Sequence, residues 1–297
     1  MKAKVLGIVL IALYGLVLIA TLSDYGINED SPGHFLRGQA YLELFLSGKR
    51  SIDQPQRTSP VMFVPGQRIS FYKLNAWESN LSPVRPISGI VGELTQQQAY
   101  AAYQEKFGRT TYYQHDAWDA RHFMESDGPG HPAVSDIGAA ATNRMFYGVL
   151  GLLADIESYH LYIVISAVGV LLVIFFFTLS EWGETAAFGA IISLALYPFF
   201  FAEAHFNMKD IPELAFFASS LLFFAWWVKK RRTIYLVLFG VALFGAAGTK
   251  LNSVTIPVIL VPWLLVIGKW KRAFHLFLAV AIVALFLVAS WPWLWDA

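Results

Sequence analysis

The feature that most constrains this chain is a series of seven apolar segments, most of them close to the length of a membrane-spanning helix. Such a helix needs about 20 mainly apolar residues. The first segment, Val5–Leu22, follows two lysines, and no small-residue cleavage motif comes after it. We therefore interpret it as a retained first helix rather than a secretory signal, with its N-terminus inside. The six later segments are Leu161–Leu179, Ala186–Phe201, Ile211–Val228, Ile234–Ala247, Val254–Ile267 and Phe274–Trp291.

The composition agrees with a membrane protein and excludes several other classes. Hydrophobic residues make up 56% of the 297 and charged residues only 14%, whereas a soluble domain has about 25% charged residues. A net charge of +1, without a basic stripe interleaved with aromatic residues, argues against nucleic-acid binding. The lack of cysteine excludes disulfides, thiol catalysis and thiolate metal sites. The sequence therefore predicts an all-α polytopic membrane protein.

The short basic connections between the apolar segments predict the topology. If the chain starts inside and crosses seven times, "KKRR" at Lys229–Arg232 and "KWKR" at Lys269–Arg272 both fall on the inner side, as the positive-inside rule requires. The connection Ser180–Glu184 falls on the same side although it is acidic, and it is the weakest part of this assignment. The regions placed outside are 23–160, 204–210, 248–252 and the C-terminal "WPWLWDA", residues 291–297.

This topology divides the chain into three parts: a first transmembrane helix at residues 1–22, an outer loop at 23–160 and a transmembrane bundle at 161–297. The chain stops just after the seventh segment, which suggests the N-terminal fragment of a longer protein. In the loop, Gly33–Gly48 and His131–Gly151 have apolar residues at helical spacing, so we predict amphipathic helices that lie at the membrane surface. Leu94–Phe107 is predicted to form a further, polar helix.

Two nearly identical turns precede the predicted loop helices. "DSPGH" spans Asp30–His34 and "DGPGH" spans Asp127–His131. In one interpretation both acids cap a helix and both Pro-Gly pairs form turns. In the other, the two turns bring an acid and an imidazole each to one pocket at the outer membrane face, where a carboxylate can accept a proton from a nucleophile and imidazoles can bind a metal ion or a phosphate.

Polar residues at the predicted outer ends of the bundle are the second group of candidates. Asp210 opens a segment in "KDIPELAFF", either as part of a capping-box-like helix start or as a second acid beside Asn207 and Lys209. Lys250 either snorkels to the interface or provides a cation for a lipid phosphate. No P-loop or dinucleotide fingerprint is present, so an activated substrate needs another route, which a lipid carrier supplies.

The order of these motifs resembles that of the membrane glycosyltransferases of the GT-C type, in particular the protein-mannosyltransferase and aminoarabinose-transferase group. In "NEDSPGHFLRGQAYL", Asp30 matches the acid and His34 the histidine at the start of that group's first outer loop. His131–Pro132 matches a later turn that opens a helix. Asp210 matches the acid after the third span, and Thr249–Lys250 matches a Thr-Lys pair at the outer end of a later span.

The resemblance implies an inverting glycosyltransferase that uses a polyprenyl-phosphate-linked sugar on the outer face of the cell membrane. Asp30 would then be the general base, with Glu29 and Asp210 as the next candidates. Lys250 would stabilise the polyprenyl phosphate as it leaves. The further substrate-binding residues implied are His34, His131, Asp127 and Asn207.

Two departures from the family pattern concern metal binding. Ser31 stands where many members have Glu, and Gly130 stands where some have an acid before the Lys-Pro or His-Pro pair. No cofactor is therefore assigned, and a divalent metal ion held by His34 and His131 stays an open alternative.

The expected partners follow from the same resemblance: a polyprenyl-phosphate-linked sugar donor, a lipid, glycan or protein acceptor, and membrane lipids, but no nucleic acid. Two other functions compete with this one. A secondary transporter is disfavoured because the charged residues lie at the ends of the apolar segments rather than near the bilayer midplane. A non-catalytic membrane scaffold is the third alternative.

Overall fold

The computed structural model describes residues 2–28, 30–50, 63–64, 67–68, 111, 113–114, 119–126 and 131–295. The predicted polar helix Leu94–Phe107 lies outside these residues. Two short strands, β1 (Phe63–Val64) and β2 (Gln67–Arg68), pair antiparallel. The chain forms two compact units. We call residues 1–21, 131–135 and 163–297 the bundle unit, and residues 22–130 and 136–162 the loop unit.

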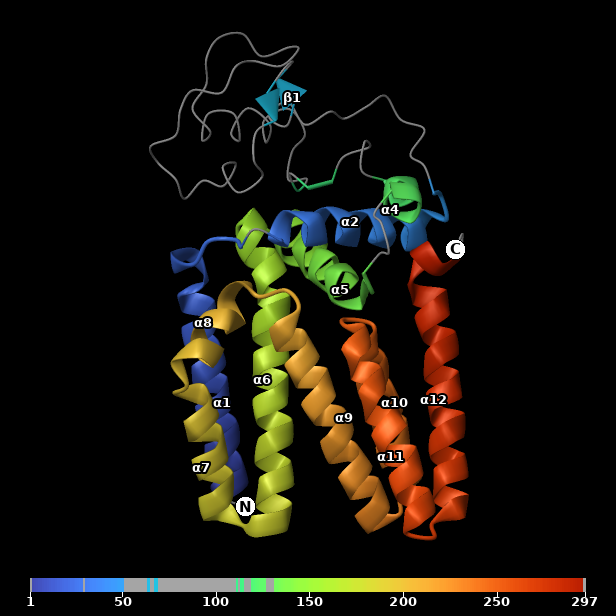
Figure 1. Ribbon diagram of the computed structural model, residues 1–297. Coiled ribbons are helices and arrows are strands. Elements are labelled where there is room, and N and C mark those ends of the chain that lie inside the picture. The colour runs from blue at the N-terminus through green and yellow to red at the C-terminus, as the bar shows by residue number, and fades with distance from the viewer. Residues whose placement is uncertain are drawn as a thin grey trace. The chain divides into compact units, whose positions relative to one another are not determined.

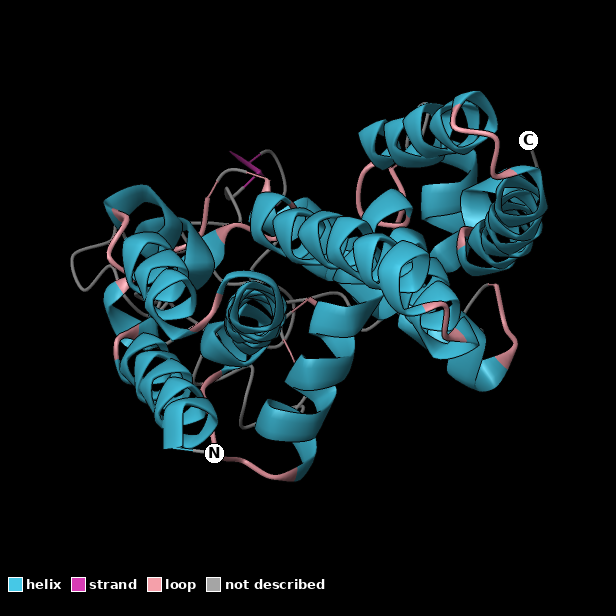
Figure 2. Ribbon diagram, turned by 90° about the horizontal axis from the view of Figure 1, so that it is seen from below, coloured by secondary structure: helices cyan, strands magenta, loops and turns pink. Residues whose placement is uncertain are grey.

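Every predicted apolar segment falls on helical structure, which confirms the all-α polytopic fold class (Figure 1). The helices are α1 (Lys2–Ala20), α6 (Asp155–Trp182), α7 (Glu184–Ala195), α8 (Pro198–Phe206), α9 (Asp210–Lys230), α10 (Thr233–Ala247), α11 (Thr255–Val266) and α12 (Trp270–Ser290). The short 3₁₀ turns η5 (Leu251–Val254) and η6 (Pro292–Trp295) precede α11 and follow α12. Figure 2, the view from below, looks along many of these helices.

The structure does not divide the seven apolar segments into seven uniform membrane-spanning helices. Among the described residues, four helices are long and apolar enough to cross a bilayer: α1, α6, α9 and α12. The segment predicted at Ala186–Phe201 is bent by 62° between α7 and α8. Its break falls at Tyr197, immediately before Pro198, because proline disfavours a helical conformation in the residue that precedes it. α10 and α11 are shorter apolar helices, so the count of seven crossings stays a prediction.

The acidic connection Ser180–Glu184 lies at the same end of the bundle unit as the basic connections. Lys229 forms an ion pair with Glu181, and the Trp226 indole Nε1 donates a hydrogen bond of 3.1 Å to the Ser180 hydroxyl. Figure 1 draws this end of the unit, which also carries the N-terminus, at the bottom. The acidic charge is therefore paired with a lysine of "KKRR", which removes the conflict within the predicted topology. Which side of the membrane this end faces stays a prediction.

Aromatic and aliphatic side chains form the packed core of the second half of the bundle unit. They come from four successive helices, so consecutive segments of the chain pack against one another. The buried members are Phe224, Trp227, Phe239, Leu243, Ile256, Leu264, Ala273, Leu276 and Val283. Burial of these side chains fixes the relative positions of α9 to α12, and hence of the polar connections at their ends.

The loop unit contains α2 (Ser31–Ser47), α4 (Ala120–Ser126), most of α5 (Val134–Asn143) with the π-helical turns of η4 (Arg144–Val149), and the first turns of α6. The helix predicted at Gly33–Gly48 is confirmed as α2, and Gly48 ends it with a left-handed φ of 71°. The Pro-Gly pair of the first turn motif lies inside the first turn of α2 and does not form a separate turn, because proline fits the first positions of a helix.

α2 and α5 pack unusually closely in this unit. A Cβ on Gly38 would lie 2.2 Å from the Asp136 carbonyl oxygen, so only glycine allows the two backbones to approach so far. Beside this contact, Gln39 Nε2 donates to Asn143 Oδ1 at 3.1 Å and to the Tyr159 hydroxyl at 2.8 Å. The helix predicted at His131–Gly151 begins only at Val134, and its first amide, which has no partner within the helix, donates to a residue outside it, as described below.

Candidate functional site

Charged and polar side chains gather at one end of the bundle unit, where α8 ends, α9 begins and α10 is followed by η5. We call Asn207, Lys209, Asp210, Glu213 and Lys250 the end cluster. Three of its members, Asn207, Asp210 and Lys250, are residues that the sequence singled out as candidates. The cluster is partly exposed, with 39% of the Lys250 side chain and 56% of the Asp210 side chain accessible to solvent.

Asn207 organises the start of α9. Its Oδ1 accepts hydrogen bonds from the backbone amides of Asp210 at 2.8 Å and Lys209 at 3.1 Å. Its Nδ2 donates to Asp210 Oδ2 at 2.9 Å and also to the carboxylate of Glu203. The capping interpretation of Asp210 is therefore wrong, because Asn207 is the side chain that satisfies the free amides at this helix start. The Asp210 carboxylate is left to make other contacts.

Lys250 forms an ion pair with Asp210, and its Nζ lies 3.8 Å from Glu213 Oε2. The Ser253 hydroxyl donates to the other Glu213 oxygen at 3.0 Å. A lysine ammonium has three N–H donors, and at 3.8 Å the contact with Glu213 is too long for a hydrogen bond. Within the described part of the chain, Lys250 therefore uses one donor on Asp210 and keeps two for a ligand. The two carboxylates hold this cation in place.

The segment that begins with His131 docks onto the end cluster. Lys209 Nζ donates to the Pro132 carbonyl oxygen at 2.9 Å, and the Val134 amide donates to the Gly248 carbonyl oxygen at 2.9 Å. A Cβ on Gly248 would lie 2.3 Å from Val134 Cγ2, so this approach depends on glycine. His131 is exposed and begins this segment. The segment is bound to Gly248, two residues before Lys250, and is therefore fixed to the connection that contains this lysine.

The side chain of Asp30 plays no part in capping α2. Asn28 Oδ1 accepts hydrogen bonds from the Ser31 amide at 2.8 Å and from the Ser31 hydroxyl at 2.6 Å. Asp30 occupies the capping position but makes no capping hydrogen bond with its side chain. Its carboxylate is exposed, and no described residue donates a hydrogen bond to it. The capping interpretation of the first turn is therefore wrong for Asp30, and its carboxylate is available for chemistry.

His34 lies one helical turn after Asp30 and contacts a buried ion pair. Its Nδ1 is 3.2 Å from Asp136 Oδ1 and 2.9 Å from a terminal nitrogen of Arg37. Arg37 Nε donates to Asp136 Oδ2 at 2.7 Å, and both members of this pair are almost completely buried. The pair fixes the ring of His34. The sequence analysis did not single out Arg37 and Asp136, although each is an isolated charge on a largely apolar helix.

Comparison with known proteins gives one match. A model of the dolichyl-phosphate-mannose-protein mannosyltransferase family matches residues 142–295, which is more than half of the chain. The chain belongs to this family. No curated protein and no solved structure matches it. As a member of the mannosyltransferase family, the protein is a glycosyltransferase and a multi-pass membrane protein.

The part matched by the mannosyltransferase family model contains all the helices of the end cluster and all five of its residues. It begins after Asp30, His34 and His131, so these three candidates rest on the resemblance of the first loop and on the geometry described above. His131, Asn207, Asp210 and Lys250 belong to the bundle unit, whereas Asp30 and His34 share the start of α2 in the loop unit. Glu29 and Asp127 lie outside the described residues.

The alternative of a metal site finds no set of ligands in the part of the chain that the structure describes. No three His, Asp or Glu side chains there are grouped so that they could hold a metal ion. His34 is held by Arg37 and Asp136, as described above.

Proposed function

We propose that this mannosyltransferase-family protein transfers a sugar from a polyprenyl-phosphate donor to a lipid, glycan or protein acceptor on the outer face of the cell membrane. The observation that carries the proposal is Lys250, a cation held by two carboxylates at the end of the bundle, with two N–H donors that no described residue uses. A lipid-linked donor presents its phosphate at the membrane surface, where such a cation can meet it.

Lys250 has the chemistry that the leaving group requires. When the bond between the anomeric carbon and the phosphate oxygen breaks, the departing polyprenyl phosphate takes up negative charge. Charge-assisted hydrogen bonds from an ammonium stabilise that charge. The contacts to Asp210 and Glu213 hold the Lys250 side chain in place before the donor arrives, so less conformational entropy is lost on binding.

Of the two candidate acids that the structure describes, Asp30 is the better candidate for the general base. Its carboxylate is exposed and accepts no hydrogen bond from a described residue. Asp210 already accepts hydrogen bonds from Asn207 and Lys250, which stabilise its ionised form and make it a weaker base. In the proposed reaction, Asp30 takes the proton as the acceptor attacks the anomeric carbon, and the single displacement inverts that centre.

The remaining candidates act on the substrates. His34, with its ring fixed by the buried pair, and His131 would position the donor phosphate or the acceptor. Asp127 and Asn207 are kept as substrate-binding residues, with Asn207 acting chiefly through Asp210 and hence through Lys250.

The proposed donor class is tested by supplying labelled sugar in two forms to membranes that contain the full-length protein. We expect label to move from a polyprenyl-phosphate-linked sugar and not from the corresponding nucleotide sugar. Membranes without the protein are the control for endogenous transferases. Transfer from the nucleotide sugar alone, under conditions that prevent formation of the lipid-linked form, would overturn the proposal.

A further inference from the structure

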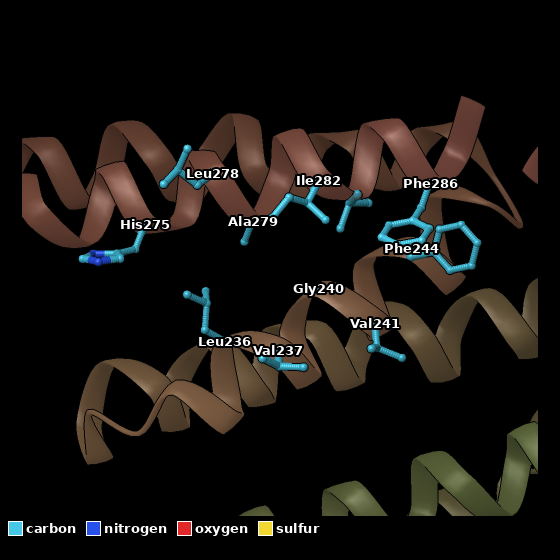
Figure 3. Close-up of a pocket in the computed structure, with 11 residues that line it drawn as sticks. Leu236, Val237, Gly240, Val241, Phe244, His275, Leu278, Ala279, Ile282 and Phe286 are labelled. Atoms are coloured by element: carbon cyan, nitrogen blue, oxygen red, sulfur yellow. The ribbon is translucent and has the colours of Figure 1, made fainter. Parts of the chain in front are cut away.

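An apolar groove runs along the surface of the bundle unit between α10 and α12 (Figure 3). Its volume is about 570 Å³, which is within the usual size of a ligand site, roughly 300–1,000 Å³. Eleven residues line it, and ten of them are apolar; His275 is the polar one. We call this cavity the α10–α12 groove.

The two ends of the groove differ in chemistry. Phe244 and Phe286 contact each other edge to face, with ring centroids 6.3 Å apart, and close one end. His275 and Leu236 form the other end, as Figure 3 shows. Lys271 lies one helical turn before His275 on α12, and Arg232 immediately precedes α10. Both of these basic residues are exposed.

His275 is oriented to add a polar contact at the basic end. Its Nδ1 lies 2.6 Å from the Lys271 carbonyl oxygen, and because a carbonyl only accepts, Nδ1 is the protonated nitrogen that donates. The second ring nitrogen, Nε2, has no hydrogen-bond partner among the described residues. In this tautomer Nε2 carries no proton and accepts, so a hydroxyl of a headgroup bound at Lys271 and Arg232 can donate to it.

The groove is long enough to hold much of one hydrocarbon chain. His275 and Phe286 are eleven residues apart on α12, which corresponds to a rise of about 16 Å. The hydrocarbon core of a bilayer is about 30 Å thick, so the groove covers about half of that depth. Phe286 lies four residues before the end of α12 and Phe244 three residues before the end of α10, so a chain that enters at the basic end runs toward the opposite ends of both helices.

We propose that the α10–α12 groove is a binding site for an anionic glycerophospholipid. One acyl chain lies in the groove, and the phosphate contacts Arg232 and Lys271, with His275 beside it. Basic residues at the end of a membrane helix attract anionic lipid headgroups, and the apolar walls select a hydrocarbon chain. The headgroup position is distinct from that proposed for the phosphate of the sugar donor, because Lys250 follows the opposite end of α10.

The occupant is tested by native mass spectrometry of the full-length protein in detergent with equal amounts of phosphatidylglycerol and phosphatidylcholine of identical chains. We expect one phosphatidylglycerol to be retained in preference to phosphatidylcholine. Each basic residue near an anionic headgroup contributes about a fivefold preference. The double variant Arg232→Gln, Lys271→Gln should therefore lower the preference for phosphatidylglycerol by roughly thirtyfold. Lys4→Gln, which removes a basic residue of α1 at the same end, is the matched control and should leave it unchanged.

Two variants test the hydrocarbon part of the site separately. Gly240→Leu and Ala279→Leu fill the groove from opposite walls, and we expect each to lower retention of both phospholipids. A Cβ at Gly240 would meet only Val283 Cγ2, at 3.8 Å, so the fold accommodates it. Equal retention of the two phospholipids by the parental protein, or unchanged retention in both filled variants, would overturn the proposal. If a polyprenyl phosphate added to the same mixture were retained in preference to both phospholipids, the proposal would be overturned and the groove assigned to the donor.

Discussion

Replacing Lys250 by alanine separates a binding role from a structural one. The ion pair with Asp210 is partly exposed, with 39% and 56% of the two side chains accessible. Exposed pairs contribute about 0–1 kcal/mol to stability. Asp210 keeps its hydrogen bond from Asn207, and Glu213 keeps that from Ser253. We therefore expect Lys250→Ala to remain folded and inserted, with at most a small loss of stability.

The effect on the donor should be much larger. A hydrogen bond from a charged group is worth about 1.5–3 kcal/mol, which corresponds to about a ten- to hundredfold change in affinity. The measurement is the initial rate of sugar transfer by membranes over a range of donor concentrations, together with the thermal stability of the purified variant. We expect the donor concentration needed for half-maximal rate to rise by about ten- to hundredfold.

Lys229 provides a matched control for this variant. It also forms a partly exposed ion pair, with Glu181, but at the opposite end of the bundle unit. Lys229→Ala should therefore leave the dependence on donor concentration unchanged. An unaltered donor dependence in a folded Lys250→Ala variant, or an equal change in both variants, would refute the assignment of Lys250 to the phosphate.

Three further predictions test other parts of the account. Gly248→Ala should destabilise the protein by about 1–3 kcal/mol, because its Cβ would overlap the facing segment; thermal melting measures the loss, and an unchanged midpoint would contradict the close approach. Asp136→Ala should cost about 3–5 kcal/mol, since it leaves the Arg37 guanidinium buried without its carboxylate, whereas a loss below 1 kcal/mol in chemical denaturation would show that the pair is not buried. A reporter fused after Lys230 should read cytoplasmic and one within residues 51–92 external; the reverse result would overturn the predicted topology.

Most of the fold could be predicted from hydrophobic run lengths alone. Runs of apolar residues long enough for a bilayer have few alternatives to a helix, because every backbone polar group must be satisfied internally. The break before Pro198 was missed, since the apolar run continues through it and hydropathy does not register a bend. The pairing of Lys229 with Glu181 was also missed. It joins two connections far apart in sequence, and only the packing of α6 and α9 brings them together.

The candidate site was predicted only in part. The sequence identified Asn207, Asp210 and Lys250, and the structure brings these three together. It did not identify Asn207 as the capping residue, because several residues in "NMKDIP" can cap a helix and the boundary shifts by one or two positions. The buried pair of Arg37 and Asp136 was not foreseen, since its members are distant in the sequence.

The central claim, that Asp30 is the general base of a lipid-dependent sugar transfer, is tested most directly by Asp30→Asn. The amide keeps the size of the side chain but cannot accept the proton, and loss of a general base typically costs about 10²–10⁴ in rate. Asn28→Ala is the matched control, because Asn28 is the residue that caps α2, and loss of a cap costs about 1 kcal/mol of stability with no direct effect on the chemistry.

The measurement is the turnover of a polyprenyl-phosphate-linked sugar at saturating donor by the parental protein and both variants. We predict a folded Asp30→Asn variant whose turnover is lower by at least about a hundredfold, beside an Asn28→Ala variant with near-parental turnover. Sugar transfer by Asp30→Asn at close to the parental rate would contradict the assignment and make Glu29 or Asp210 the next candidate.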